Sequence, residues 1–186
     1  DEWKDDKNFI NDIMRFLDNV LTDFIDKAPE QFKDAKYSAM RERSVGLGVM
    51  GLHSYFQKNM IPLESVMSKV WNKKIFKNIQ EKADQASKDL ADERGACPDA
   101  AEYNFKERFS NKTAIAPTAS ISIICGGASP GVEPVAANSY THKTLSGSYN
   151  VRNRYLKKVL EKHGKNDDET WSSITTNQGS ISHLDF

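Results

Sequence analysis

The chain has 186 residues, of which 38% are hydrophobic and 28% are charged, a balance typical of an ordinary folded protein in water. Lysine and arginine together number 26, as do aspartate and glutamate, so no overall charge attracts the chain to nucleic acid or to an anionic membrane. No apolar run approaches the roughly 18 residues of a membrane helix, and the acidic start does not resemble a signal peptide, so we expect a cytoplasmic location.

The first part of the sequence has the pattern of a helical protein. Apolar residues at helical spacing predict an amphipathic helix over residues 8–26, with Asp18 on its polar side together with two other aspartates. A short second helix is expected over 30–40 and a long third one from about 65 to 93. Gly95, followed by a proline, ends the third helix in the usual order of termination signals.

An apolar segment with three glycines, residues 43–52, separates the second helix from the third. It predicts a strand or tight turn that runs into a helix. The spacing of Gly46, Gly48 and Gly51 also fits the GxGxxG motif of dinucleotide-binding folds, which would need a βαβ unit and a suitably placed acidic residue. Close packing against a neighbouring backbone explains the glycines better, because no other residue is small enough.

Near Lys112 the composition changes to small, hydroxylated and β-branched residues. We therefore divide a single partial domain, residues 1–186, into a helical part over 1–110 and a second part over 111–186. The second part begins with a predicted short buried strand at 113–116.

A hairpin and two helices are expected in the rest of the second part. The hairpin covers 144–151 with its turn at Ser146 and Gly147, and the helices cover 155–163 and 168–176. The fold class predicted for the whole chain is mixed α/β and mainly helical.

The turn after the predicted strand has the composition of an anion site. Its proline ends the strand, and the next residues offer successive backbone N–H groups at the start of a helical turn, where donors are unpaired and carry partial positive charge. A phosphate is the natural partner of such donors. The alternative is that the hydroxyl residues merely cap a helix. The candidate phosphate-binding residues are Pro117, Thr118, Ala119, Ser120 and Ile121.

Metal-binding patterns are missing from the sequence. Cys97 and Cys125 are far apart and have no second ligand nearby, so we predict two buried, reduced thiols rather than a zinc site. The four histidines are scattered outside any metal-binding spacing: His53, His142, His163 and His183. We expect no metal and no cofactor bound by this chain.

Two spaced motifs in the second part resemble the substrate-phosphate segment of ribonucleotide reductase large subunits. They are AIAPTASIS at 114–122 and SPGVEP at 129–134, and further similarity lies in 43–52, 93–98 and 140–147. The resemblance spans most of the chain. It implies that the chain is an incomplete part of the family's ten-stranded α/β barrel, from the C-terminal part of that barrel.

The resemblance also implies a role for the turn from Pro117 to Ile121. In that family the turn binds the diphosphate of a ribonucleoside diphosphate, largely through backbone amides, during reduction to deoxyribonucleotides for DNA synthesis. Neither Cys97 nor Cys125 lies in the family's Asn-x-Cys-x-Glu motif, so no catalytic residue is expected here and the chain alone should be inactive. Glu133 is expected to be a buried carboxylate that binds loop amides rather than an acid catalyst.

The partners that the resemblance implies are the rest of the large subunit and a radical-generating small subunit that carries a metal, with thioredoxin or glutaredoxin as reductant. No nucleic-acid or membrane partner is expected. Residues 141–151 and 171–174 look more like the oxygen-dependent class, while the cobalamin-dependent class shares the turn and stays open. A non-catalytic helical module that binds partners or a phosphorylated ligand is the competing hypothesis. A solvated basic face is expected at Lys143, Arg152, Arg154, Lys157 and Lys158.

Overall fold

The computed structural model describes residues 8–144 and 147–185. The chain forms two compact units, each made of two separate stretches of sequence. The first unit comprises Asp1–Val49 and Val66–Ala116, and the second comprises Met50–Ser65 and Pro117–Phe186.

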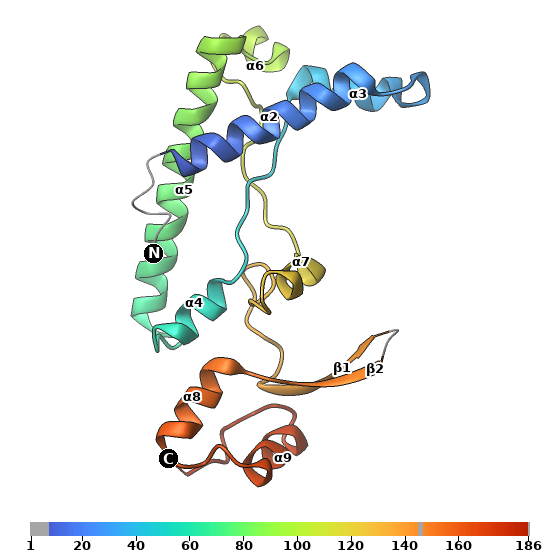
Figure 1. The fold of residues 1–186 in the computed structure, drawn as a ribbon. Helices are drawn as coiled ribbons and strands as arrows, with labels where there is room; N and C mark the ends of the chain where they lie inside the picture. Colours follow the sequence, from blue (N-terminus) through green and yellow to red (C-terminus); the bar gives the residue numbers. More distant parts are fainter. Residues whose placement is uncertain (1–7, 145–146, 186) are drawn as a thin grey trace. The chain divides into compact units, whose positions relative to one another are not determined.

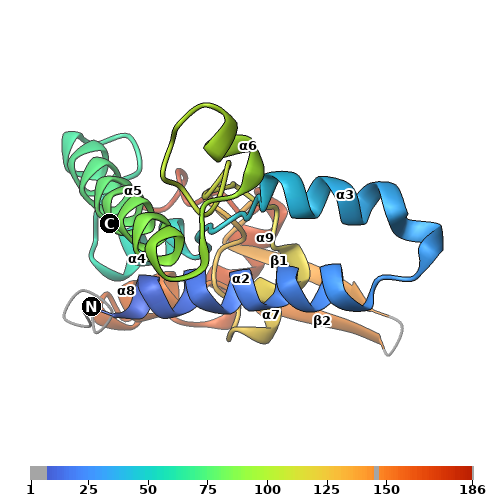
Figure 2. The ribbon, with the colours of Figure 1, turned by 90° about the horizontal axis from the view of Figure 1, so that it is seen from above.

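The first unit is built from helices. Figures 1 and 2 show α2 starting beside α5 and running from there towards α3. The helices predicted over 8–26, 30–40 and 65–93 are confirmed, with small shifts of their ends. The elements of this unit are α2 (Phe9–Lys27), the 3-10 helix η1 (Glu30–Phe32), α3 (Lys33–Glu42), α5 (Val66–Arg94) and α6 (Pro98–Glu102).

The core of the first unit lies where α2 meets the C-terminal half of α5. Ile10 and Met14 of α2 are buried against small and branched residues of α5. Alanine at the contact allows the two helices to approach closely, and the buried side chain of Phe109 packs in the same cluster. The α5 residues of this cluster are Ala83, Ala86 and Leu90.

The glycine-rich segment pairs with the stretch that follows residue 110. Leu47 and Thr113 form an isolated parallel bridge. A Cβ atom at Gly46 would lie 2.9 Å from Ala114 Cβ, and one at Gly48 would overlap the Ala114 carbonyl oxygen. The predicted close packing of backbones is therefore confirmed. The alternative interpretation of these glycines as a dinucleotide-binding motif is wrong, since the described residues contain one two-stranded antiparallel sheet and no βαβ unit.

The prediction of a buried strand at 113–116 is wrong. Only Thr113 forms a bridge, and Ile115 is 69% exposed. Side chains of an extended segment project from its two faces, and no layer of the described residues packs over the side chain of Ile115.

The second unit combines short helices with a hairpin (Figure 1). The hairpin strands are antiparallel, with Tyr140 opposite Val151, and they confirm the predicted hairpin although the first strand starts earlier. Of the two residues expected in its turn, Ser146 lies outside the described residues, and Gly147 is instead the first residue of the second strand, opposite Thr144. The elements are α4 (Leu52–Lys58), α7 (Ala119–Ile124), β1 (Ser139–Thr144), β2 (Gly147–Arg152), α8 (Arg154–Lys162) and α9 (Asp168–Thr176).

Local signals explain the two C-terminal helices, which match the predictions over 155–163 and 168–176. Asn153 caps α8 by accepting hydrogen bonds from two backbone amides, and Asp167 caps α9 through the Thr170 amide. The two helices bury one shared cluster, formed by Leu156, Leu160, Trp171 and Ile174.

The predicted fold class is confirmed: the chain is mainly helical with a small sheet. No closed barrel forms within residues 8–144 and 147–185. None of the helices described there combines the length and the apolar composition needed to cross a membrane.

Candidate functional site

The predicted phosphate turn lies at the beginning of α7, in the second unit. Pro117 is exposed, and Thr118 occupies the N-cap position with φ 49° and ψ 25°. A β-branched residue rarely adopts this left-handed conformation, because its side chain crowds the backbone. Contacts with other residues must therefore hold Thr118 in place.

The first turn of α7 presents three backbone donors. The first hydrogen bond of the helix runs from the Ser122 amide to the Thr118 carbonyl at 2.9 Å. The amides of Ala119, Ser120 and Ile121 precede it and have no hydrogen-bond partner among the described residues. All three residues are exposed, so their N–H groups are available to an anion, which the partial positive charge of a helix start favours.

Thr118 does not cap its own helix. Its Oγ1 instead accepts a hydrogen bond from the amide of Gly131 at 2.7 Å. Gly131 is buried and has φ 47°, a conformation suited to glycine. The two motifs that resembled the reductase segment, 114–122 and 129–134, are thus joined directly by this bond.

The loop that carries Gly131 is attached to α4 through Ser129. Gly51 is the N-cap residue of α4 and has no side chain with which to cap it. Ser129 takes over this role: its Oγ accepts from the Ser54 amide at 3.1 Å, and its carbonyl accepts from the Gly51 amide at 2.8 Å. Sequence reasoning missed this attachment, for which the only signal was the position of Ser129 in a recognised motif.

A histidine of α4 holds the far end of the same loop. His53 Nδ1 accepts a hydrogen bond from the Val135 amide at 3.1 Å. Burial lowers the pKa of His53, which favours the neutral ring that this acceptor role requires.

Two side chains near the turn, Cys125 and Glu133, are more exposed than predicted. Cys125 is exposed at the end of α7, so the prediction that it is buried is wrong, because that helix leaves its last residues uncovered. Glu133 is exposed too, so it is not the buried carboxylate that was expected. Arg154 is exposed as predicted, and it donates a hydrogen bond to the Gly126 carbonyl just after α7. Cys97 is buried, as predicted.

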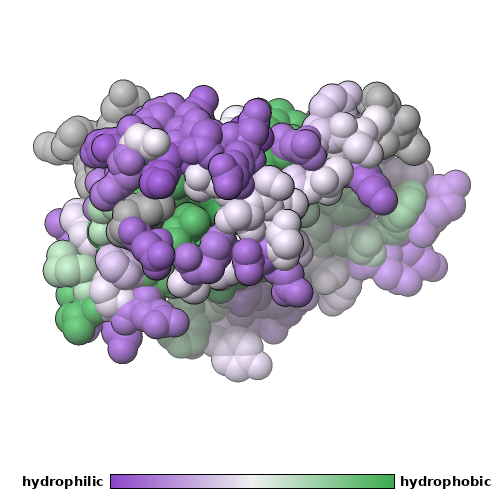
Figure 3. Space-filling view, turned by 90° about the horizontal axis from the view of Figure 1, so that it is seen from below, coloured by the Kyte–Doolittle hydropathy of each residue, from purple (hydrophilic) through white to green (hydrophobic). Residues whose placement is uncertain are grey.

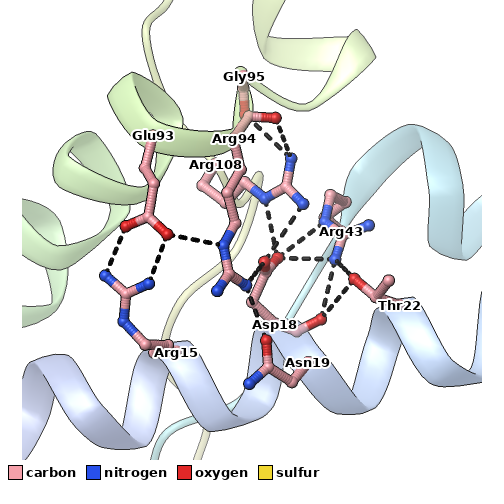
Figure 4. A network of polar contacts seen from close by, with 9 residues as sticks. All are labelled: Arg15, Asp18, Asn19, Thr22, Arg43, Glu93, Arg94, Gly95 and Arg108. Carbon is pink, nitrogen blue, oxygen red and sulfur yellow. Dashed lines mark hydrogen bonds and ion pairs between the residues drawn. The ribbon is translucent and has the colours of Figure 1, made fainter.

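A second polar cluster, in the first unit, surrounds Asp18 (Figure 4). The prediction that Asp18 lies on the polar side of its helix is wrong: it follows Ile10 and Met14 at intervals of four on the buried face and is 0% exposed. Arg43 donates to Asp18 Oδ1 from Nε at 2.9 Å and from Nη2 at 2.7 Å. Arg94 and Arg108 complete the cluster, with shortest contacts of 2.9 and 2.8 Å.

Electrostatics keep this aspartate ionised. Burial by itself raises its pKa, but hydrogen bonds from Arg108, Arg43 and Arg94 outweigh burial and leave the pKa of Asp18 below its ordinary value. Because the arginines come from the end of α3, the end of α5 and the stretch after α6, one carboxylate fastens three segments to α2. Its role is structural.

Comparison with known proteins places these features in one family. The family model described as "Ribonucleotide reductase, barrel domain" matches residues 2–109 and 101–186. The ribonucleoside-diphosphate reductase large subunits of Invertebrate iridescent virus 3 and Invertebrate iridescent virus 6 are 42% and 45% identical to the chain, each over 99% of it. The chain covers only 29% and 19% of their lengths.

A solved structure shows the same likeness in three dimensions. The class Id ribonucleotide reductase alpha subunit of Actinobacillus ureae matches with a TM-score of 0.88 and 38% sequence identity, over 100% of this chain and 34% of that one. The chain thus spans about a fifth to a third of the length of these proteins.

Proposed function

Because the chain belongs to the ribonucleotide reductase large-subunit family, as part of its barrel domain, we propose that it contributes the substrate diphosphate-binding turn to the reduction of ribonucleoside diphosphates. The turn consists of Pro117, Thr118, Ala119, Ser120 and Ile121.

One observation carries this proposal: the amides of Ala119, Ser120 and Ile121 at the start of α7 have no hydrogen-bond partner in the part of the chain that the structure describes. A diphosphate offers several acceptor oxygens and negative charge, which suits three adjacent N–H donors. The hydrogen bond from Gly131 already fixes Thr118 before the ligand binds. Ordering the turn therefore adds little to the entropic cost of binding. The contact needs no lysine or arginine in the turn.

The rest of the large subunit supplies the remaining chemistry in this proposal. Cys97 is buried and Cys125 lies at the end of α7, outside the family's catalytic motif, so this segment alone does not turn over substrate. Radical-forming cysteines come from elsewhere in the subunit. A small subunit with a metal generates the radical, and thioredoxin or glutaredoxin returns the electrons.

Exposed apolar side chains support packing against the rest of the subunit. On the face drawn in Figure 3, hydrophobic patches interrupt a mostly hydrophilic surface. Along α2, Phe16, Val20 and Phe24 are exposed, and in α7 Ile123 and Ile124 are more than half exposed. The three α2 side chains follow one another at intervals of four on one helix face, and a contiguous apolar surface of this kind is typical of a protein interface.

A pair of isosteric substitutions tests the diphosphate site. In a full-length large subunit that carries this segment, Ala119→Asp places a negative charge at the first position of α7. The charge favours the helix itself but repels a phosphate. Ala119→Asn has the same shape without the charge.

We expect Ala119→Asp to weaken binding of cytidine diphosphate, measured by calorimetry, at least about 10-fold relative to Ala119→Asn, which corresponds to about 1.4 kcal/mol. The difference should shrink at high salt. Equal affinities of the two variants would remove the turn from the substrate site.

A further inference from the structure

Two serines fix the loop that holds the phosphate turn. Ser129 is 0% exposed and Ser54 is 7% exposed. The Ser129 amide donates to Ser54 Oγ at 2.8 Å, and the Ser54 amide donates to Ser129 Oγ at 3.1 Å. Each hydroxyl thus accepts from the backbone of the other residue, which an apolar side chain cannot do.

This pair is connected to the turn through a short piece of backbone. Gly131 follows Ser129 by two residues, and its amide donates to Thr118 Oγ1 at 2.7 Å. A displacement of Ser129 therefore moves the Gly131 donor away from Thr118. Thr118 would then lose the contact that holds it in the left-handed conformation from which α7 starts.

We propose that Ser54 is a positioning residue for the phosphate turn, acting through Ser129 and Gly131 on Thr118. The inference rests on the proposed diphosphate-binding function of the turn. Ser54 touches neither the turn nor its free amides; its hydroxyl fixes where the loop, and with it the start of α7, lies. Without that hydroxyl the buried Ser129 amide has no acceptor.

The test compares Ser54→Ala with Ser139→Ala in a full-length large subunit that carries this segment. Ser139 is a matched control, because it is also 7% exposed and hydrogen bonded, to Thr175 at 2.7 Å, but belongs to the hairpin. We expect Ser54→Ala to weaken cytidine diphosphate binding about 10-fold, because loss of the acceptor lets the loop leave its position and only the fraction with a positioned loop binds. Ser139→Ala should bind as the parent does. Ser54→Thr, which keeps the acceptor, should recover most of the affinity.

A double-mutant cycle separates positioning from general stability. Thr118→Val removes the other end of the connection while keeping the shape of the side chain. If Ser54 acts through Thr118, Ser54→Ala combined with Thr118→Val weakens binding little more than the stronger single change. Effects that multiply instead would overturn the proposal.

Amide hydrogen exchange gives a readout that does not depend on substrate. In the full-length large subunit without substrate, Ser54→Ala should accelerate exchange of the Gly131 amide and leave the amides of α9 unchanged. Equal acceleration throughout the second unit would mean that Ser54 only stabilises the fold, and would overturn the proposal. If Ala119→Asp weakens binding while Ser54→Ala behaves as Ser139→Ala, the positioning role fails and the proposed function stands. If Ala119→Asp has no effect, the proposed function fails, and the positioning role of Ser54, which rests on it, fails too.

Discussion

Arg43 donates two hydrogen bonds to one carboxylate oxygen of Asp18, at 2.9 and 2.7 Å, although both side chains are buried. A buried ion pair of this kind need not stabilise a fold more than two apolar side chains of similar volume would. Removing only one of the ions, however, leaves the other buried and uncompensated. Arg94 and Arg108 share the same carboxylate, so the loss affects three cations at once (Figure 4).

Replacing this carboxylate should therefore destabilise the first unit strongly. We expect Asp18→Ala to lower the free energy of unfolding in urea by about 3 kcal/mol or more, as for other broken buried pairs. Asp23→Ala in the same helix is the control, because Asp23 pairs with Lys27 on the surface and should matter little. A comparable effect of both substitutions would contradict the assignment of Asp18 as the centre of this cluster.

The contribution of Asp18 should also depend on pH in a defined direction. Its pKa is lowered in the folded state, so the unfolded chain binds the proton more readily. The stabilisation is present above the unfolded-state pKa, about 3.9, and is lost as the pH falls through the lower folded-state value. Urea titrations of the parent and of Asp18→Ala should differ most near pH 6 and converge under acid conditions. A gap that widens on acidification would refute this.

His53 should make the loop around Val135 sensitive to mild acid. Burial lowers the pKa of His53, so this group stabilises the fold above its unfolded-state pKa, about 6.5, and the contribution is lost as the pH falls through the folded-state value. Protonation of Nδ1 removes the acceptor of the Val135 amide. Protection of that amide from hydrogen exchange should therefore decrease as the pH falls from neutrality through the folded-state pKa of His53, after correction for the intrinsic rate. The Asn153 amide, which donates to a carbonyl at 2.8 Å, is the internal control and should stay protected.

The two cysteines should react with a thiol reagent at very different rates. Cys125 is exposed and Cys97 is 0% exposed, so a maleimide should label one position in the folded chain and both in urea. Mass spectrometry of the tryptic peptides identifies the labelled residue. Labelling of Cys97 at the rate of Cys125 without denaturant would show that the first unit opens readily around it.

Features that depend on neighbouring residues could be predicted from the amino-acid sequence alone. Apolar periodicity and caps located α2, α5, α8 and α9, because a helix is specified by residues within a few positions of one another. The start of α7, where we propose the phosphate turn, could be predicted in the same way, since Pro117 and the small residues after it define that helix start locally.

Contacts between residues far apart in the sequence became known only from the fold. Ser54 and Ser129 are 75 positions apart, and no local pattern distinguishes a serine that accepts across a fold from one that faces solvent. Asp18 was misplaced for the same reason, because its burial is tolerable only with arginines from 25, 76 and 90 positions away. Cys125 and Glu133 were expected to be buried but are exposed. Their burial could not be predicted, because it depends on which distant segments pack over a residue.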